Sequence, residues 1–286
     1  MNIKKKLTSH FINGDIKTNY FEDLLYIFFF IIEIYKDKRK IQNEFYFGNF
    51  KKFHDLEDDK NIFFKNAPSR VLCELFLLNW LKNNFNPNTK INILDVGCGN
   101  AVAIKIFQKF FKEVNYFGCD YKKRENWKDL EKTGVNLFTY NIGDNFEKKL
   151  PVIDLVHSQS VFEHVKYDLS GFEILSKKFE NSKHIHFLPA PISFLNYEKH
   201  GYRRYSYSDL KKLKKILNKD QMKIYNIGGL NTFKYHFNFL INNNFKNFRM
   251  SKYLKHNIDF EDSFKLLKFL VSDKLKSFPV FYAIEL

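Results

Sequence analysis

One stretch of the chain, residues 91–101, restricts the possible folds more than any other. It reads INILDVGCGNA, so a short apolar run is followed at once by two glycines, Gly97 and Gly99. Beyond them the apolar residues recur at a spacing close to that of a helix, from Val102 to Phe107. Strand, glycine turn and helix in this order form the first unit of an open α/β sheet, where a ligand lies at the carboxyl ends of the strands.

The spacing of the glycines separates this turn from a dinucleotide-binding turn. That fingerprint is G-x-G-x-x-G with an apolar residue two positions before the first glycine, whereas here Asp95 stands there and Val102 replaces the third glycine. The pattern Asp-x-Gly-x-Gly resembles the first motif of class I S-adenosylmethionine (AdoMet)-dependent methyltransferases. A carboxylate suits the cationic sulfonium and ammonium groups of that cofactor. Ala101 is a mild departure from the motif, and a nucleotide-binding turn of another kind stays open.

Two further strand ends carry polar residues at matching places. Asp120 follows the expected second strand, 114–119, about 20 residues beyond the glycine turn, where an acidic residue can accept both ribose hydroxyls. Asn141 and Ile142 follow the expected third strand, 135–140; in the family, residues at this place bond the adenine amine and cover the ring. The alternatives are a helix cap at Asp120 and an Asx turn at Asn141.

The expected fourth strand, 152–156, leads into a second motif. The run IDLVHSQSVFEHV resembles the fourth motif of small-molecule methyltransferases. The resemblance covers residues 90–230. It implies an α/β fold, a three-layer αβα Rossmann-like sandwich with a seven-stranded, mostly parallel sheet in the order 3-2-1-4-5-7-6. It implies AdoMet as the cofactor, held by Asp95, Gly97, Cys98, Gly99, Asp120, Tyr121, Asn141, Ile142 and Ser158.

The loop after the fourth strand bears on the chemistry, because in this family it lies under the transferable methyl. The Pro-Pro-aromatic pattern of exocyclic-amine methylation is absent, and no cysteine follows Cys119 to attack a pyrimidine carbon. Transfer to a hydroxyl needs a base, and histidine is suited because its pKa lies near neutrality. The candidate catalytic residues are therefore His157, His164 and His200. His157 and His164 could also be satisfied histidines at the sheet edge, and in the family His164 is often a packing residue.

Residues 197–206, YEKHGYRRYS, follow the expected fifth strand, 183–188. They resemble the His-x-x-Arg-Arg-Tyr-Ser segment of many small-molecule and glycan methyltransferases. The segment joins a strand to a helix capped by Ser206 or Ser208, so it should overhang the acceptor pocket. An arginine fork there would match a phosphate, although the arginines could instead pair with acids of the protein. The candidate acceptor-binding residues are Glu198, His200, Arg203, Arg204 and Tyr205.

The remaining segments define the domain organisation. Residues 1–85 are expected to be a helical N-terminal extension, with helices at 20–35 and from Pro68 onward. Residues 86–286 form the methyltransferase domain, completed by strands at 223–227 and 280–284. An aromatic, basic insertion at 231–276 should fold over the acceptor site as a helical lid.

Composition limits the partners and the location. The formal charge of +15 could favour nucleic acid or a membrane surface, but the lysines are spread along the whole chain, outside any recognised nucleic-acid module. The apolar run 24–32 is too short to span a bilayer, so a buried helix is expected, with a membrane-surface helix at 20–35 as the alternative. Three cysteines without paired spacing argue against disulfides and structural zinc, no signal peptide is visible, and we expect a cytoplasmic protein.

These features predict an AdoMet-dependent methyltransferase that O-methylates a small molecule, sugar or glycan or lipid-linked precursor. Nothing in the sequence requires a metal. An RNA methyltransferase would explain the charge, and a non-catalytic AdoMet-binding scaffold or regulatory protein would keep the cofactor residues. A nicotinamide oxidoreductase would share the sheet, but Asp95 and Val102 argue against it.

Overall fold

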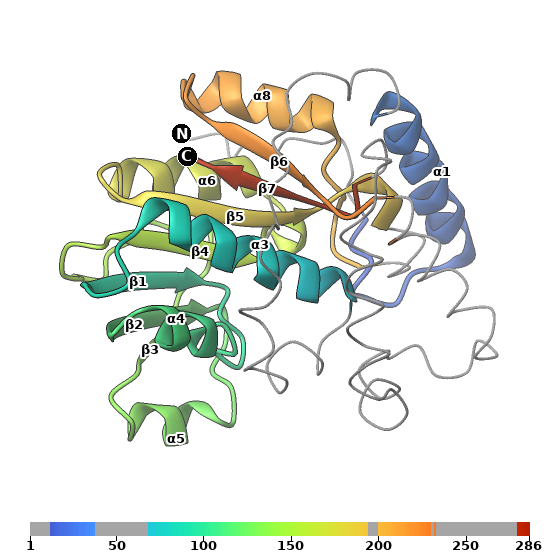
Figure 1. Cartoon of the computed structure of the whole chain (residues 1–286). Helices are drawn as coiled ribbons and strands as arrows, with labels where there is room; N and C mark the ends of the chain where they lie inside the picture. The colour runs from blue at the N-terminus through green and yellow to red at the C-terminus, as the bar shows by residue number, and fades with distance from the viewer. Residues whose placement is uncertain (1–11, 38–67, 194–199, 230–231, 233–278) are drawn as a thin grey trace, which may run out of the picture.

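The computed structural model describes residues 12–37, 68–193, 200–229, 232 and 279–286 (Figure 1). Its centre is a seven-stranded sheet in the order β3-β2-β1-β4-β5-β7-β6, which confirms the predicted order. β1 to β5 run parallel, and β7 lies antiparallel between β5 and β6. The strands are β1 (Lys90–Val96), β2 (Glu113–Asp120), β3 (Asn136–Thr139), β4 (Leu155–Gln159), β5 (Lys183–Pro189), β6 (Lys223–Ile227) and β7 (Phe281–Glu285).

Helices cover both faces of the sheet, so the predicted three-layer architecture is confirmed (Figure 1). On one face lie α3 (Pro68–Asn84) and α4 (Ile104–Phe110), and on the other α6 (Asp168–Lys178) and α8 (Tyr207–Leu217). The short helix α5 (Trp127–Glu131) lies near β3, and the 3-10 turns η2 (Phe162–His164) and η3 (Pro191–Ser193) follow β4 and β5.

β1 is buried on both faces, as a central parallel strand must be. Ile91 and Ile93 pack in the cluster under α3 and α4, whereas Leu94 and Val96 pack in the cluster on the opposite face. This alternation follows from the two-residue period of a strand. It places the glycine turn, directly after Val96, at the carboxyl edge of the sheet.

The predicted position of the fourth strand was wrong by three residues. Val152 is 79% exposed, and the Asp154 carboxylate accepts a hydrogen bond from the Asn92 amide, so this part of the chain leads into the strand instead of forming it. The strand begins at Leu155 and includes His157 and Ser158, which therefore lie within β4 instead of in the loop after it.

Of the two predicted caps of α8, the structure confirms Ser206 and not Ser208. Ser206 is the N-cap, and its side chain accepts a hydrogen bond from the Asp209 amide while the Asp209 side chain accepts one from the Ser206 amide. This capping box satisfies two backbone donors at the helix start. Leu210 and Leu213 are buried on the sheet side, whereas Ile216 is 44% exposed.

The helix predicted at residues 20–35 is present as α1 (Tyr20–Asp37). It was predicted to be buried, but only part of its surface is. Tyr26 and Phe30 are buried where α1 contacts η3 and α8, whereas Phe21, Phe28 and Ile31 are more than half exposed. In the part of the chain that the structure describes, we find no helix with the length and apolarity needed to cross a bilayer.

Two buried histidines on β5 make stability depend on pH. The Nε2 atom of His184 lies 2.9 Å from the Phe179 carbonyl oxygen, and the Nδ1 atom of His186 lies 2.8 Å from the Ser158 hydroxyl. Burial lowers the pKa of His184 to about 4 and lowers the pKa of His186 well below its ordinary value. Both histidines are therefore neutral in the folded chain near neutral pH.

We expect the free energy of unfolding to fall as the pH is lowered below about 6.5, the ordinary histidine pKa. There the unfolded chain binds protons that the folded chain cannot, at a cost of about 1.4 kcal/mol per pH unit for each histidine. The contribution of these histidines to the free energy of unfolding is complete above the histidine pKa of the unfolded chain. It is lost as the pH falls from that value towards the histidine pKa of the folded chain. Urea unfolding between neutral pH and pH 4 measures this slope. His184→Gln should have a shallower slope, and an unchanged slope would contradict the assignment.

Candidate functional site

A cavity of about 1000 Å³ opens at the carboxyl ends of β1, β2 and β4. The strand order reverses between β1 and β4, and ligands of open α/β sheets bind at such a point. Most of the predicted cofactor residues line this cavity: Asp95, Gly97, Cys98, Gly99, Asp120, Tyr121, Asn141 and Ile142. His157 and His164 line it as well.

The glycine turn is tied to the end of β2. The amides of Gly97 and Cys98 both donate to the Cys119 carbonyl oxygen, at 2.7 and 2.9 Å. Gly97 and Gly99 have φ angles of +71° and +54°, a region that favours glycine. A Cβ on Gly97 would lie 2.3 Å from a methyl of Val161, whereas a Cβ on Gly99 would meet nothing within 4 Å. Gly97 therefore permits close packing, and Gly99 leaves space for a ligand.

This difference predicts unequal effects of two alanine substitutions. Gly99→Ala should destabilise the fold by about 1 kcal/mol, the cost of a left-handed backbone with a Cβ. Gly97→Ala should cost roughly 1–3 kcal/mol more, because the new methyl overlaps Val161. Urea unfolding of both variants measures the difference. Equal stability of the two variants would contradict the packing role of Gly97.

Asp120 lies at the end of β2 with 5% of its surface exposed. One carboxylate oxygen accepts from the Gly99 amide at 2.9 Å, and the Arg124 guanidinium contacts both oxygens, at 3.1 and 3.3 Å. The amide of Lys122 lies 3.5 Å from the other oxygen, so a ligand hydroxyl would compete with Lys122 and Arg124 for the acceptor positions of this carboxylate. The amide bond fixes the carboxylate beside the glycine turn.

Asp95 is directed mainly towards the sheet. It is 3% exposed, accepts a hydrogen bond from the Tyr116 hydroxyl, and lies 2.8 Å from the Nδ1 atom of His157. Since a carboxylate only accepts, Nδ1 of His157 carries the proton. Burial and the charge of Asp95 raise the pKa of Tyr116 well above its usual range. Asp95 thus lines the cavity while two contacts within the protein hold its carboxylate in place, and its contact with cofactor cations stays a prediction.

His157 was predicted at the end of its strand, but the structure places it inside β4. Its side chain is 1% exposed and lies within β4, between the rings of Phe107 and Phe187. Its Nε2 atom is buried without a hydrogen-bond partner among the described residues. His157 forms part of the cavity wall but is poorly placed to accept a proton from a bound acceptor.

Ser158 is the one predicted cofactor residue that does not line the cavity. It is fully buried, and its hydroxyl pairs with His186, because the strand begins later than predicted and turns this side chain into the core. Asn141 and Tyr121 are exposed at the cavity, and the Asn141 amide donates to the Asp144 carboxylate at 2.9 Å.

The expected positions of Arg203, Arg204 and Tyr205 also need correction, because all three are almost completely buried. Arg203 donates to the Asp168 carboxylate at 2.7 Å, and the Tyr205 hydroxyl donates to the other oxygen of Asp168 at 3.0 Å. Arg204 donates to the His200 carbonyl oxygen, and its guanidinium lies 5.6 Å from the ring centroid of Phe30. The arginines thus support the segment from inside instead of facing an acceptor. Glu198 and the expected lid at 231–276 lie outside the described residues, apart from Thr232.

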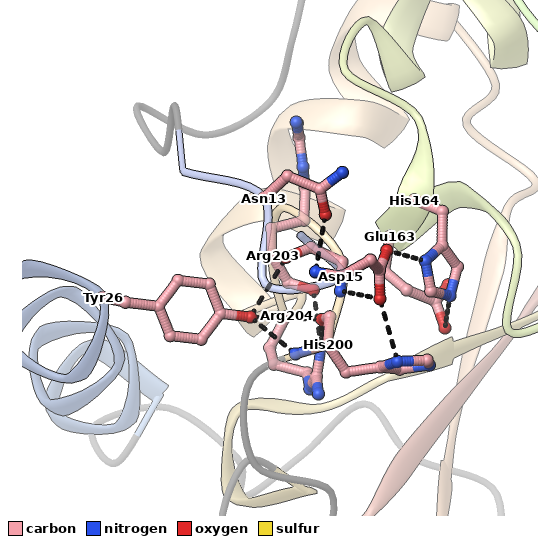
Figure 2. A network of polar contacts seen from close by, with 9 residues as sticks. Asn13, Asp15, Tyr26, Glu163, His164, His200, Arg203 and Arg204 are labelled. Atoms are coloured by element: carbon pink, nitrogen blue, oxygen red, sulfur yellow. Dashed lines mark hydrogen bonds and ion pairs between the residues drawn. The ribbon is translucent and has the colours of Figure 1, made fainter. Parts of the chain in front are cut away.

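Figure 2 shows a cluster that the sequence did not reveal, two of whose residues, Asp15 and His164, line the cavity. One oxygen of Asp15 lies 2.6 Å from Nδ1 of His164, and the other lies 3.1 Å from Nδ1 of His200. The two imidazole rings meet edge to face with centroids 4.4 Å apart. We call Asp15, His164 and His200 the acid–histidine cluster. Its histidines were predicted, but Asp15 belongs to no motif and is distant in sequence.

The electrostatics of the cluster favour a charged Asp15. Partial burial would raise its pKa, but hydrogen bonds from His164 and His200 hold the pKa well below the usual range. Burial would lower the pKa of His164, but Asp15 and Glu163 outweigh it and raise that pKa. Glu163 lies beneath His164 and is fully buried, which raises its own pKa.

The N-terminal segment is fastened to the 200–201 turn by several hydrogen bonds (Figure 2). The Gly14 amide donates to the Gly201 carbonyl oxygen at 2.8 Å, and the Gly201 amide donates to Asp15 at 3.0 Å. The hydroxyl of Tyr26, on α1, accepts from the His200 amide at 3.0 Å and donates to the Gly201 carbonyl oxygen at 3.1 Å. The N-terminal extension therefore contributes directly to the site.

No protein-family model matches this sequence, and no curated protein matches it. Among solved structures, the plantazolicin methyltransferase BpumL, in complex with a triazolic desmethylPZN analog and SAH, is 14% identical with a TM-score of 0.49, over 91% of this chain and 98% of that chain. The methyltransferase domain of bacterial CtHen1 is 17% identical with a TM-score of 0.44, over 57% of this chain and 92% of that chain.

A SAM-dependent methyltransferase from Aquifex aeolicus is 15% identical with a TM-score of 0.40, over 55% of this chain and 84% of that chain. All three solved structures are methyltransferases by description. Because one fold hosts many functions, the function of this chain has to be argued from its site.

Proposed function

We propose that this chain is an AdoMet-dependent methyltransferase that methylates an oxygen of a small hydroxylated acceptor, such as a sugar or a glycan or lipid-linked precursor. The observation that carries the proposal is one cavity that joins the glycine turn, the Asp120 carboxylate and the Asn141–Ile142 pair. These groups come from the ends of three adjacent strands, as the sequence resemblance implies for this cofactor.

The described residues fit AdoMet in shape and in chemistry. Gly99 offers open space at the turn, and the Asp120 carboxylate beside it can accept hydrogen bonds from ribose hydroxyls. Asn141 can accept from the adenine amine, and Ile142 can cover the ring. When bound, AdoMet supplies an electrophilic methyl on a sulfonium, which is already a good leaving group. The protein then chiefly has to align an acceptor oxygen with that methyl.

The opposite wall of the cavity supplies groups for the acceptor. His164 is 32% exposed, lines the cavity and is oriented by Asp15, so it is better placed than His157 to act on a hydroxyl. Arg70 and Lys166 also line the cavity and can attract an anionic acceptor such as a phosphosugar, whereas Arg124 contacts Asp120 on the cofactor side. We place the acceptor hydroxyl at the acid–histidine cluster.

We also propose a cytoplasmic location. Cys73, Cys98 and Cys119 are all free, as cysteines are in a reducing compartment. This proposal is independent of the acceptor.

Transfer of a labelled methyl group tests the proposed activity. The full chain is incubated with methyl-labelled AdoMet and with nucleotide sugars, lipid-linked sugars or structured RNA. We expect the labelled methyl group to be bound to an oxygen of a sugar-type acceptor, as a methyl ether. The rate of transfer should fall about 100-fold or more in His164→Ala. Label in RNA alone would contradict the acceptor class. AdoMet binding without transfer to any acceptor would support a scaffold role instead.

A further inference from the structure

The acid–histidine cluster brings together three donors from distant segments of the chain. One oxygen of Asp15 and one ring nitrogen each of His164 and His200 all lie within 4.8 Å of one another. The three side chains are 32%, 32% and 46% exposed, so the group is open on one side. Asp15 and His164 line the cavity, which places that group at the acceptor end of the site.

Two imidazoles and one carboxylate form a donor set that suits divalent first-row transition ions such as Zn²⁺, Mn²⁺ or Fe²⁺. Three protein ligands leave coordination positions for an exogenous group, as in catalytic metal sites. Both histidines present Nδ1 to Asp15, so one ion near the carboxylate would be within reach of both rings. The present hydrogen bonds are those expected between ligands that share a site without an ion.

The surroundings of the cluster support its ligands from behind. The Nε2 atom of His164 faces a carboxylate oxygen of Glu163 at 3.9 Å, and Glu163 is 1% exposed. The second oxygen of Glu163 is buried without a hydrogen-bond partner among the described residues. At 3.9 Å the contact is longer than a hydrogen bond, so Glu163 would have to move closer to orient the ring as carboxylates behind metal-binding histidines do. Hydrogen bonds within the cluster do not account for the buried Glu163 side chain, because one of its carboxylate oxygens has no partner among the described residues.

The backbone holds the ligands in place. The Gly201 amide donates to Asp15, and the Tyr26 hydroxyl holds the His200 amide at 3.0 Å. A Cβ on Gly201 would lie 2.6 Å from the Glu163 carbonyl oxygen, so glycine allows the turn to approach η2 closely. The nearby Arg204 charge is directed to the His200 carbonyl oxygen on the inner side of the turn.

We propose that Asp15, His164 and His200 bind one divalent transition-metal ion, whose open positions face the acceptor hydroxyl. Metal binding follows from the donor geometry alone, whereas the role of the ion rests on the proposed function. The ion acts as a Lewis acid that lowers the pKa of the bound hydroxyl. His164 then serves as a ligand instead of the proton acceptor, and the hydroxyl proton passes to solvent as the oxygen–methyl bond forms and the sulfur–methyl bond breaks.

Calorimetric titration of the chelator-treated full chain with Zn²⁺, in the absence of AdoMet, tests the site. We expect one ion per chain, and at least a 100-fold weaker affinity in Asp15→Asn, His164→Ala and His200→Ala. Asp129→Asn is the matched control, because this exposed aspartate on α5 pairs with Lys132, takes no part in the acid–histidine cluster and should leave the affinity unchanged. No binding by the wild type, or equal binding by all variants, would overturn the proposal.

The absorption spectrum of the wild type with Co²⁺ gives a readout that does not depend on the folding of variants. We expect d–d bands without thiolate charge transfer, since the ligands are nitrogen and oxygen. A thiolate band would assign the metal to cysteines, of which Cys98 is the partly exposed one, and would overturn the proposal. AdoMet binding is measured on the same samples. Retained AdoMet binding without metal binding refutes the metal site alone, whereas metal binding without AdoMet binding refutes the proposed function alone.

Discussion

Replacing Asp168 by alanine is expected to destabilise the fold by about 3–5 kcal/mol, a large share of the roughly 5–15 kcal/mol that stabilises a typical domain. Asp168 is fully buried and bonds both Arg203, at 2.7 Å, and the hydroxyl of Tyr205, at 3.0 Å. Without the carboxylate, a guanidinium with no exposed surface is left unpaired in the core. Burying an unpaired charge is far more costly than losing an exposed ion pair.

Urea unfolding of the variant measures this loss. Asp129→Ala provides the control, since its carboxylate is 79% exposed and should change stability by less than about 1 kcal/mol. The double variant Asp168→Leu/Arg203→Met should recover part of the stability, because both charges are removed together. Equal stability of Asp168→Ala and Asp129→Ala would contradict the structural role given to the buried pair.

Replacing Asp120 by asparagine is expected to weaken AdoMet binding by about 100-fold. A hydrogen bond to a charged group contributes about 1.5–3 kcal/mol, and each 1.4 kcal/mol is tenfold in affinity. The amide keeps the shape of the side chain but replaces one acceptor oxygen with a donor, which faces the Arg124 guanidinium and a ribose hydroxyl. Stability should fall less than binding, because the remaining oxygen can still accept from the Gly99 amide.

Equilibrium dialysis with labelled AdoMet measures the affinity, with Asp129→Asn as the matched control. A variant that binds AdoMet as the wild type does would remove Asp120 from the cofactor site. Parallel unfolding curves separate loss of binding from loss of the fold.

The parts of the site that could be predicted from the sequence are those set by local patterns. The glycine turn follows directly from Gly97 and Gly99 after an apolar strand, and Asp120 follows from its spacing beyond that turn. The strand order came from the resemblance and not from the pattern of residues. These local predictions succeeded because each strand end places its own next residues at the edge of the sheet.

Other parts depended on packing between distant segments. The arginines were predicted either to bind the acceptor or to pair with acids of the protein, and Arg203 follows the second alternative, because it pairs with Asp168 at the start of α6 and is buried. His157 was placed after its strand because the polar residues at 157–160 suggested a loop, whereas pairing with β5 continues to Gln159. Asp15 could not be predicted, since only the folded chain brings residue 15 next to residues 164 and 200.

Titration of the wild-type chain with AdoMet and with its demethylated product tests the central claim most directly. We expect each chain to bind one molecule of either compound with micromolar affinity, and the two compounds to compete for the same site. An absence of binding heat for both compounds, on a chain shown to be folded, would contradict the claim that the cavity at the carboxyl ends of β1 and β2 is an AdoMet site.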